Sequence, residues 1–252
     1  MKQFTIQPEI SRFTDPTTKI RKNEKFISET VNAFYHANYI GGNRRWNQKQ
    51  TFEHNFWILK NDAIKPSDME LQDATEWLSD ILDEDLPQVH RQSGLQQLTV
   101  VVVPRAKKEE CYTANQLLFR DTISCWSDKV DWLKNGAKYI IRHTNTITTH
   151  LNSGDGDLPY PGITAETCHI SNEIKGKDIL LIDDLYTKPV NIDEDCIQAL
   201  LDKGAKSVIF YAVGKTMSPK EKDLYAQRLY RKPFSALNSQ EKERLFPLLL
   251  YV

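Results

Sequence analysis

The spacing of apolar residues in the first part of the chain predicts helices. Apolar residues recur at helical spacing over 28–39 (SETVNAFYHANY) and again over 67–82, where Ser67 is a suitable N-cap. The acidic segment 83–88 (DEDLPQ) predicts a turn that closes this part. Residues 1–95 are therefore predicted to form a mainly helical N-terminal region.

From residue 98 onward, strand patterns alternate with helix patterns. LTVVVVP (98–104) is a continuous β-branched run, which is typical of a strand buried on both faces of a parallel sheet. Further strands are predicted over 137–144, 167–173, 175–184 and 207–215, and helices over 113–133 and 192–202. This order predicts an α/β core over 96–217 with a parallel sheet. Residues 218–252 are predicted to add two helices as a C-terminal extension.

Composition and charge narrow the classes of partner. The 252 residues are 40% hydrophobic, as in a folded globular protein, and Lys+Arg 33 against Asp+Glu 34 leaves a net charge of −1. This balance does not indicate a nucleic acid or an anionic membrane as partner. The start, MKQFTIQPEISRF, lacks the apolar core of a signal peptide, and no run approaches the roughly 20 apolar residues of a membrane helix. We therefore expect a cytoplasmic protein without a membrane partner; a homo-oligomer is compatible with the sequence.

The metal-binding residue types do not show the spacing of a metal site. The cysteines form no CxxC pair and the histidines no HxxxH pair. We therefore predict no protein-held metal and expect the cysteines to be reduced thiols.

Two adjacent acids, Asp183 and Asp184, follow the apolar run of the strand predicted over 175–184. Ligands of parallel sheets bind beyond the carboxyl ends of the strands, where two carboxylates can accept hydrogen bonds from the vicinal hydroxyls of a sugar. The next helix begins near residue 192, and its first amide groups favour an anion such as phosphate. The alternative is that the two acids only start a turn and cap this helix.

The segment around these acids resembles a known family. DILLIDDLYTKPVNI (178–192) and GAKSVIFYAVGKT (204–216) are similar to the phosphoribosyl pyrophosphate (PRPP) signature of type I phosphoribosyltransferases. Asp-Asp-Leu-Tyr-Thr is closest to the competence-protein-F-like branch, in which Asp-Asp-Val-Tyr-Thr is frequent. VVVVPRAKK (100–108) and YIIRHTNT (139–146) are similar to further parts of that branch. The resemblance covers about 98–216 and implies a type I phosphoribosyltransferase-like core.

The resemblance implies a role for each matching residue. Asp183 and Asp184 correspond to the catalytic acid pair that holds the ribose diol. The phosphate loop corresponds to Tyr186, Thr187, Lys188, Val190 and Asn191. The side chains expected to face pyrophosphate are Arg105, Lys107 and Arg142, although a solvated basic loop is an alternative for the first two. Mg²⁺ is expected to accompany PRPP without direct protein ligands.

The predicted phosphate loop departs from the family pattern at Lys188-Pro189-Val190-Asn191, where the family has Thr-Gly-Ala-Thr. Proline has no N–H group, so a backbone donor to phosphate is lost, and the Lys188 charge is a candidate replacement. The polar residues 145–162, which include NSGDGD (152–157), are predicted to form a flexible lid.

The expected function is the transfer of ribose 5-phosphate from PRPP to a nitrogen nucleophile, with release of pyrophosphate. PRPP or a phosphoribosyl nucleotide is the expected partner. Two alternatives stay open: a non-catalytic PRPP or nucleotide sensor, and an interaction protein whose site is vestigial.

Overall fold

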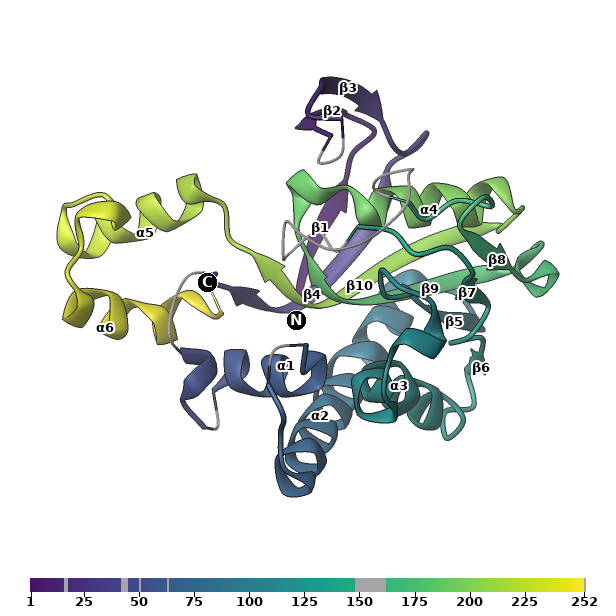
Figure 1. The fold of residues 1–252 in the computed structure, drawn as a ribbon, viewed down its shortest axis with the longest axis horizontal. Coiled ribbons are helices and arrows are strands. Elements are labelled where there is room, and N and C mark those ends of the chain that lie inside the picture. The colour runs from purple at the N-terminus through teal and green to yellow at the C-terminus, as the bar shows by residue number, and fades with distance from the viewer. Residues whose placement is uncertain (16–17, 42–44, 50, 63, 148–161, 252) are drawn as a thin grey trace.

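A six-stranded sheet forms the centre of the protein (Figure 1). The structure is a computed structural model, and it describes residues 1–252 except 16–17, 42–44, 50, 63, 148–161 and 252. The strand order is β1-β4-β10-β9-β5-β6, and only the edge strand β1 runs antiparallel to its neighbour. Their bounds are β1 Lys2–Ile6, β4 Val31–Tyr39, β5 Leu98–Val102, β6 Leu133–Asn135, β9 Asp178–Tyr186 and β10 Ser207–Thr216. The prediction of an α/β fold with a mostly parallel sheet is confirmed.

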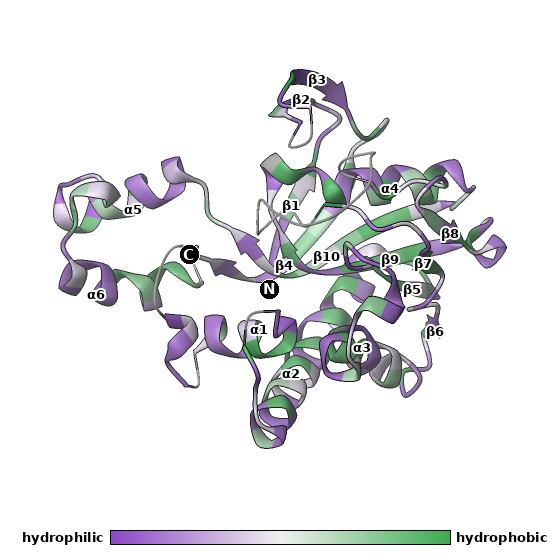
Figure 2. Cartoon of the chain, viewed as in Figure 1, coloured by the Kyte–Doolittle hydropathy of each residue, from purple (hydrophilic) through white to green (hydrophobic). Residues whose placement is uncertain are grey.

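Helices cover both faces of this sheet (Figure 1). One face packs against α1 Phe52–Lys60, α2 Asp68–Ser93 and α3 Leu118–Ser127. The other face packs against α4 Ile192–Asp202 and a two-stranded sheet of β7 Ile140–Arg142 and β8 Cys168–Ile170. Hydrophobic residues concentrate in the central strands between these two layers (Figure 2).

The elements that the sequence predicted most directly are present. β5, β9 and β10 are strands of long apolar runs, as expected for strands covered on both faces. The helix predicted over 192–202 is α4, which is followed by Gly204 at φ +96°, a conformation that favours glycine. The C-terminal extension forms α5 Pro219–Tyr230 and α6 Ser239–Leu249, and each begins with a capping box.

The helix predicted over 28–39 is wrong, because most of this segment is the strand β4. Of the residues of β4, Asn32 alone is exposed, and the strand lies between β1 and β10. A strand buried on both faces has no polar alternation, so its apolar residues also matched a helical spacing. The preceding segment forms the hairpin of β2 Ile10–Thr14 and β3 Arg21–Lys25, so the described residues of region 1–95 contain four strands as well as two α-helices.

The turn predicted over 83–88 is also wrong, because α2 continues through Pro87 to Ser93. Ser67 is its N-cap, as predicted. Leu82, Leu86 and Val89 are buried and continue the apolar face of the helix, which outweighs the loss of one backbone N–H at the proline.

Three further elements differ from the prediction in extent or pairing. The helix predicted over 113–133 is a short 3₁₀ turn, Ala114–Leu117, followed by α3, which ends at Ser127. The predicted strands 137–144 and 167–173 form β7 and β8, but they pair with each other outside the central sheet. Within the described residues, no helix is both long and apolar enough to cross a membrane.

Candidate functional site

A cavity of about 410 Å³ opens at the carboxyl edge of the parallel strands β5, β9 and β10. This is the edge at which open α/β sheets bind ligands. Its apolar wall comes from helices on one face of the sheet, with Phe56 and Leu59 from α1, Trp77 from α2 and Phe119 from α3. The cavity therefore combines an apolar wall with the polar residues that follow the strands.

Most of the residues predicted to form the site line this one cavity, although they come from separate segments. The predicted residues in its lining are Arg105, Lys107, Arg142, Asp183, Asp184, Thr187 and Val190. They follow β5, end β7, or lie at the end of β9 and in the turn after it. The tertiary structure thus brings together seven of the ten predicted side chains.

The other three predicted residues do not line the cavity. Tyr186 is 4% exposed and donates a hydrogen bond to Glu194 Oε1 at 2.8 Å. Lys188 Nζ instead forms an exposed ion pair with Glu9 at 2.8 Å. Asn191 is buried and precedes α4 with φ 60°. The predicted role of these three residues in a phosphate loop is therefore not supported by their placement, since 188–190 form a 3₁₀ turn.

Asp183 and Asp184 lie near the end of β9, which continues for two more residues to Tyr186, whereas the predicted strand ended at residue 184. Consecutive side chains of a strand point to opposite faces of the sheet. Asp183 accordingly contacts Asp193 of α4, whereas Asp184 contacts Lys60 of α1 on the other face. Asp184 N also donates to Asp183 Oδ1 at 2.8 Å. The two acids do not cap α4, whose N-cap is Asn191.

Lys60 is a member of the site that the sequence did not predict. Its ammonium group lies 3.0 Å from Asp184 Oδ2 and lines the cavity. Burial opposes the charge of Lys60, but the carboxylates of Asp184 and Asp183 outweigh it and hold the pKa of Lys60 above its usual value. No local sequence signal connects a lysine at the end of α1 with a strand so far along the chain.

Asp193 is a second unpredicted member. It lies in the first turn of α4, is 3% exposed and lines the cavity. Burial, followed by the charge of Asp184, raises the pKa of Asp183 to about 7. Burial and the neighbouring Asp183 carboxylate raise the pKa of Asp193 well above its usual range. This part of the cavity therefore holds acids that resist losing their protons.

The cavity is also lined by basic side chains. Arg105 lies 4.4 Å from the ring centroid of Tyr112, pairs with Asp62 and donates to the Gln116 carbonyl at 2.8 Å. Buried Arg142 donates to the Arg105 carbonyl at 2.7 Å, and burial lowers the pKa of its guanidinium.

Lys107 Nζ donates to the Thr146 carbonyl at 2.9 Å. Most of the partners of these cations are carbonyl groups, so the positive charge is compensated by few carboxylates. An anion is thus favoured beside these cations.

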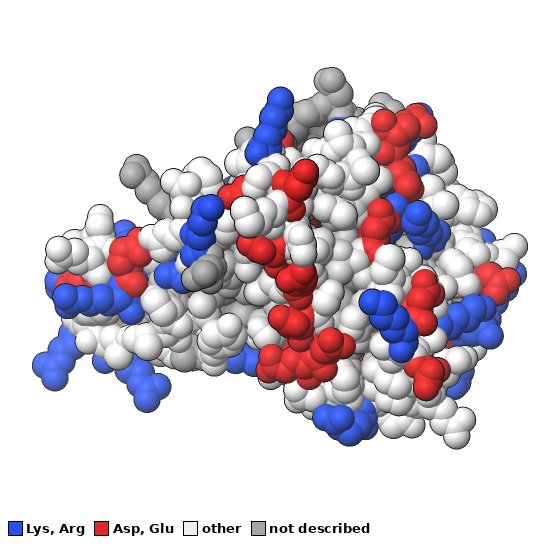
Figure 3. Space-filling view, turned by 90° about the horizontal axis from the view of Figure 1, so that it is seen from below, with Lys and Arg blue, Asp and Glu red and all other residues white. Residues whose placement is uncertain are grey.

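The outer surface of the layer formed by α1, α2 and α3 is acidic. Acidic side chains form a band across this side of the molecule when it is seen from below (Figure 3). Exposed acids of α2 are Asp68, Asp73, Glu76, Asp80, Asp83 and Glu84. The basic residues of the cavity are therefore a local feature and do not extend into a general positive surface on this side.

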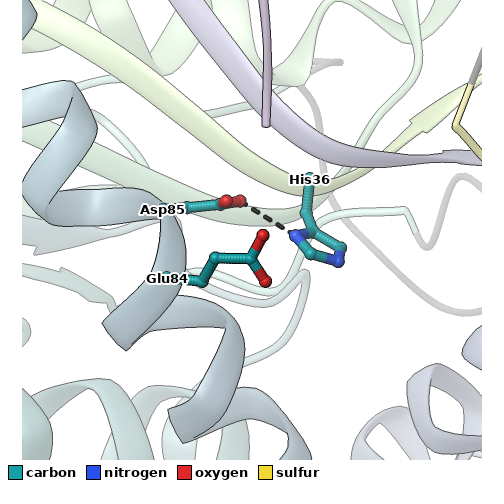
Figure 4. Close-up of side chains that lie close together, drawn as sticks. All are labelled: His36, Glu84 and Asp85. Carbon is teal, nitrogen blue, oxygen red and sulfur yellow. Dashed lines mark hydrogen bonds and ion pairs between the residues drawn. The ribbon is translucent and has the colours of Figure 1, made fainter.

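One cluster in the described part of the chain has the spacing of metal ligands, which the sequence did not reveal. His36 of β4 and Glu84 and Asp85 of α2 have ligand atoms within 4.8 Å of one another (Figure 4). However, Asp85 is hydrogen-bonded to His36 Nδ1 at 3.0 Å and to the Tyr211 hydroxyl at 2.8 Å. These hydrogen bonds of buried Asp85 link α2 to the strands β4 and β10 and account for the cluster, so we assign it no metal.

The predicted lid over 145–162 lies largely outside the described residues, as does all of 152–157. In comparisons by sequence, neither a protein-family model nor a curated protein matches this chain.

Proposed function

We propose that the chain binds PRPP or a phosphoribosyl nucleotide in the cavity and transfers ribose 5-phosphate from PRPP to a nitrogen nucleophile. The observation that carries this proposal is the charge composition of the cavity, which is lined both by acids of β9 and by three cations, Arg105, Lys107 and Arg142. PRPP offers a matching group to each kind of side chain, a ribose diol for the acids and a pyrophosphate for the cations. The proposed core is a type I phosphoribosyltransferase fold, which the parallel strands with helices on both faces support.

In the proposed reaction, the nitrogen lone pair forms a bond to the anomeric carbon while the bond to pyrophosphate oxygen breaks. The electron pair of that bond leaves with pyrophosphate. Asp183 and Asp184 would orient the ribose through its hydroxyls, and the cations would stabilise the leaving group. The apolar wall at Phe56, Trp77 and Phe119 would exclude water from the reacting atoms.

The residues at the cavity fit Mg²⁺ that arrives with PRPP. Carboxylate oxygens are the ligands that Mg²⁺ and its bound waters prefer, and Asp183 and Asp184 present them at the cavity. Because Lys60 is paired with Asp184, a direct bond between that carboxylate and the ion would have to displace an ammonium group. When bound, Mg²⁺ would neutralise pyrophosphate charge, and the contacts of the chain with it would run through water and ribose hydroxyls.

A second candidate function is a PRPP or nucleotide sensor without turnover. The placement of the turn 188–190 favours it, because Lys188 pairs with Glu9 and not with the cavity. A site that keeps the acids and cations but lacks the usual phosphate loop could bind the ligand without aligning it for transfer.

Calorimetry with PRPP and Mg²⁺ tests the proposal, together with an assay for pyrophosphate release in the presence of a panel of bases and amines. Asp184→Asn should weaken binding by about 1–3 kcal/mol, the usual effect of losing a charged hydrogen-bond partner. Asp178→Asn is the matched control, since Asp178 begins the same strand and pairs with Lys206 outside the cavity. Binding with pyrophosphate release supports the enzyme, and binding without release supports the sensor. Absence of PRPP binding would refute both.

A further inference from the structure

The first turn of α4 contains three consecutive acids with different partners. Glu194 Oε1 accepts a hydrogen bond from the Tyr186 hydroxyl at 2.8 Å, and Asp195 Oδ2 accepts one from the Ile163 amide at 2.6 Å. Each of these two acids therefore has a hydrogen-bond donor for one of its oxygens, although Glu194 Oε2 has none among the described residues. Asp193 is 3% exposed, and its Oδ1 is buried without a donor among the described residues. The side chain that it contacts, Asp183, is itself a carboxyl group.

Two ionised carboxylates cannot hydrogen-bond to each other, because both are only acceptors. One proton must therefore be shared by Asp183 and Asp193. The strongest charges acting on Asp193 are those of Asp183, Glu194 and Asp184, and all of them are acids. The ammonium group of Lys60, which also lines the cavity, is paired with Asp184 on the other face of β9.

Asp193 is the better place for the shared proton. It is buried more completely than Asp183, which is partly exposed at the cavity. Burial disfavours the charged form of a carboxyl group, so the more buried member of a pair keeps the proton. The other member, Asp183, is also within the field of Lys60, which favours its ionised form.

We propose that Asp193 is a neutral hydrogen-bond donor that positions the Asp183 carboxylate at the cavity. Burial and the neighbouring acids raise the pKa of Asp193 well above its usual range, which agrees with this assignment. A carboxyl donor on a rigid helix turn holds one Asp183 oxygen in place and leaves the remaining lone pairs for the ligand. Asp193 is thus a positioning residue, and its effect on ribose binding rests on the proposed function.

The protonation of Asp193 can be measured without any ligand. In protein labelled with ¹³C at the aspartate carboxyl groups, the Asp193 signal is assigned by its loss in Asp193→Asn. We expect this signal to remain that of a protonated acid at neutral pH. A signal that titrates near pH 4, the ordinary range for aspartate, would overturn the proposal. Asp195→Asn is the matched control. It removes an acid from the same helix turn, but this acid does not line the cavity.

Binding experiments test the positioning role. Asparagine keeps an N–H donor without charge, so Asp193→Asn should bind PRPP with Mg²⁺ within about threefold of the wild type, whereas Asp193→Leu should lose about tenfold or more. Equal affinities of the two variants would overturn the positioning role. If the leucine variant does not fold, a loss of about tenfold in Asp193→Asn contradicts the proposal by itself. If the wild type does not bind PRPP, the proposed function fails, and the carboxyl signal still decides the protonation of Asp193.

Discussion

Lys60 Nζ lies 3.0 Å from Asp184 Oδ2, and this ion pair joins the end of α1 to the end of β9 at the cavity. Both side chains are largely buried, with 22% and 23% of their side-chain surface exposed. The pair therefore places a helix from the N-terminal part of the chain in direct contact with the acids of the candidate site. It also compensates one of two adjacent negative charges, which would otherwise repel an anionic ligand.

Lys60→Met should weaken PRPP binding about tenfold or more, because the Asp184 charge would be left without its partner beside an anionic ligand. Lys60→Arg should retain most of the affinity, since it keeps the positive charge. Calorimetry measures both. The exposed Lys65, in the loop after α1, provides the control Lys65→Met. Unchanged affinity of the folded Lys60→Met variant would contradict a role for the ion pair in binding.

The raised pKa values of buried acids predict how stability depends on pH. The pKa values of Asp183 and Asp195 are about 7 in the folded protein, against an unfolded value of 3.8. The folded state therefore binds more protons than the unfolded chain between about pH 4 and about pH 7, and the free energy of unfolding falls as pH rises through this window. In urea denaturation, the free energy of unfolding should be lower by roughly 1–3 kcal/mol at about pH 8 than at about pH 5.

Asp195→Asn checks the cause of this pH dependence. Removing one of these acids should raise the free energy of unfolding more at about pH 8 than at about pH 5, so that this free energy depends less on pH. A variant with the same pH dependence as the wild type would mean that the protons are bound elsewhere.

Tyr186→Phe should destabilise the protein by about 1–3 kcal/mol, because Glu194 loses the donor to its buried carboxyl group. PRPP affinity should change little, since Tyr186 is covered by α4 and does not line the cavity. Thermal or urea denaturation and calorimetry measure the two effects. The partly exposed Tyr225 of α5 offers the control Tyr225→Phe. A large loss of PRPP affinity without loss of stability would mean that Tyr186 takes part in binding after all.

Lys188→Ala should leave PRPP affinity within about twofold of the wild type at low salt, because exposed ion pairs such as Lys188–Glu9 contribute little. This expectation opposes the idea from the sequence that Lys188 replaces the N–H group missing at Pro189. Calorimetry at low ionic strength decides between them, since a direct contact with phosphate would be strongest there. Glu9→Ala is the matched control: it should also have no effect.

Asp85→Ala should lower the free energy of unfolding by about 3 kcal/mol, because the buried carboxylate joins α2 to His36 and Tyr211. Glu84→Ala, at the exposed neighbour, should have a much smaller effect. The same melting experiments test our assignment of no metal to this cluster. A rise in Tm with Zn²⁺ that His36→Ala abolishes would show that the cluster binds metal after all.

Much of the central fold was predictable because its signals are local. Short segments of the sequence determine the apolar runs of β5, β9 and β10 and the end of α4 before Gly204. Each of these features was identified. β4 was misread as a helix, since a strand covered on both faces carries no alternation to distinguish it. Pairing with β1 and β10 decided its conformation.

The sequence by itself determined that polar residues would meet at one edge of the sheet, because parallel strands in one sheet end at the same edge. This is why Arg105 and Asp183 line one cavity. Only the tertiary structure decided the pairings within it, such as Lys60 with Asp184 and Asp193 with Asp183. Alternation along β9 directs its two acids to opposite layers, and the identity of their partners depends on how α1 and α4 pack there. Such packing is a property of the assembled layers, and no short segment of the sequence encodes it alone.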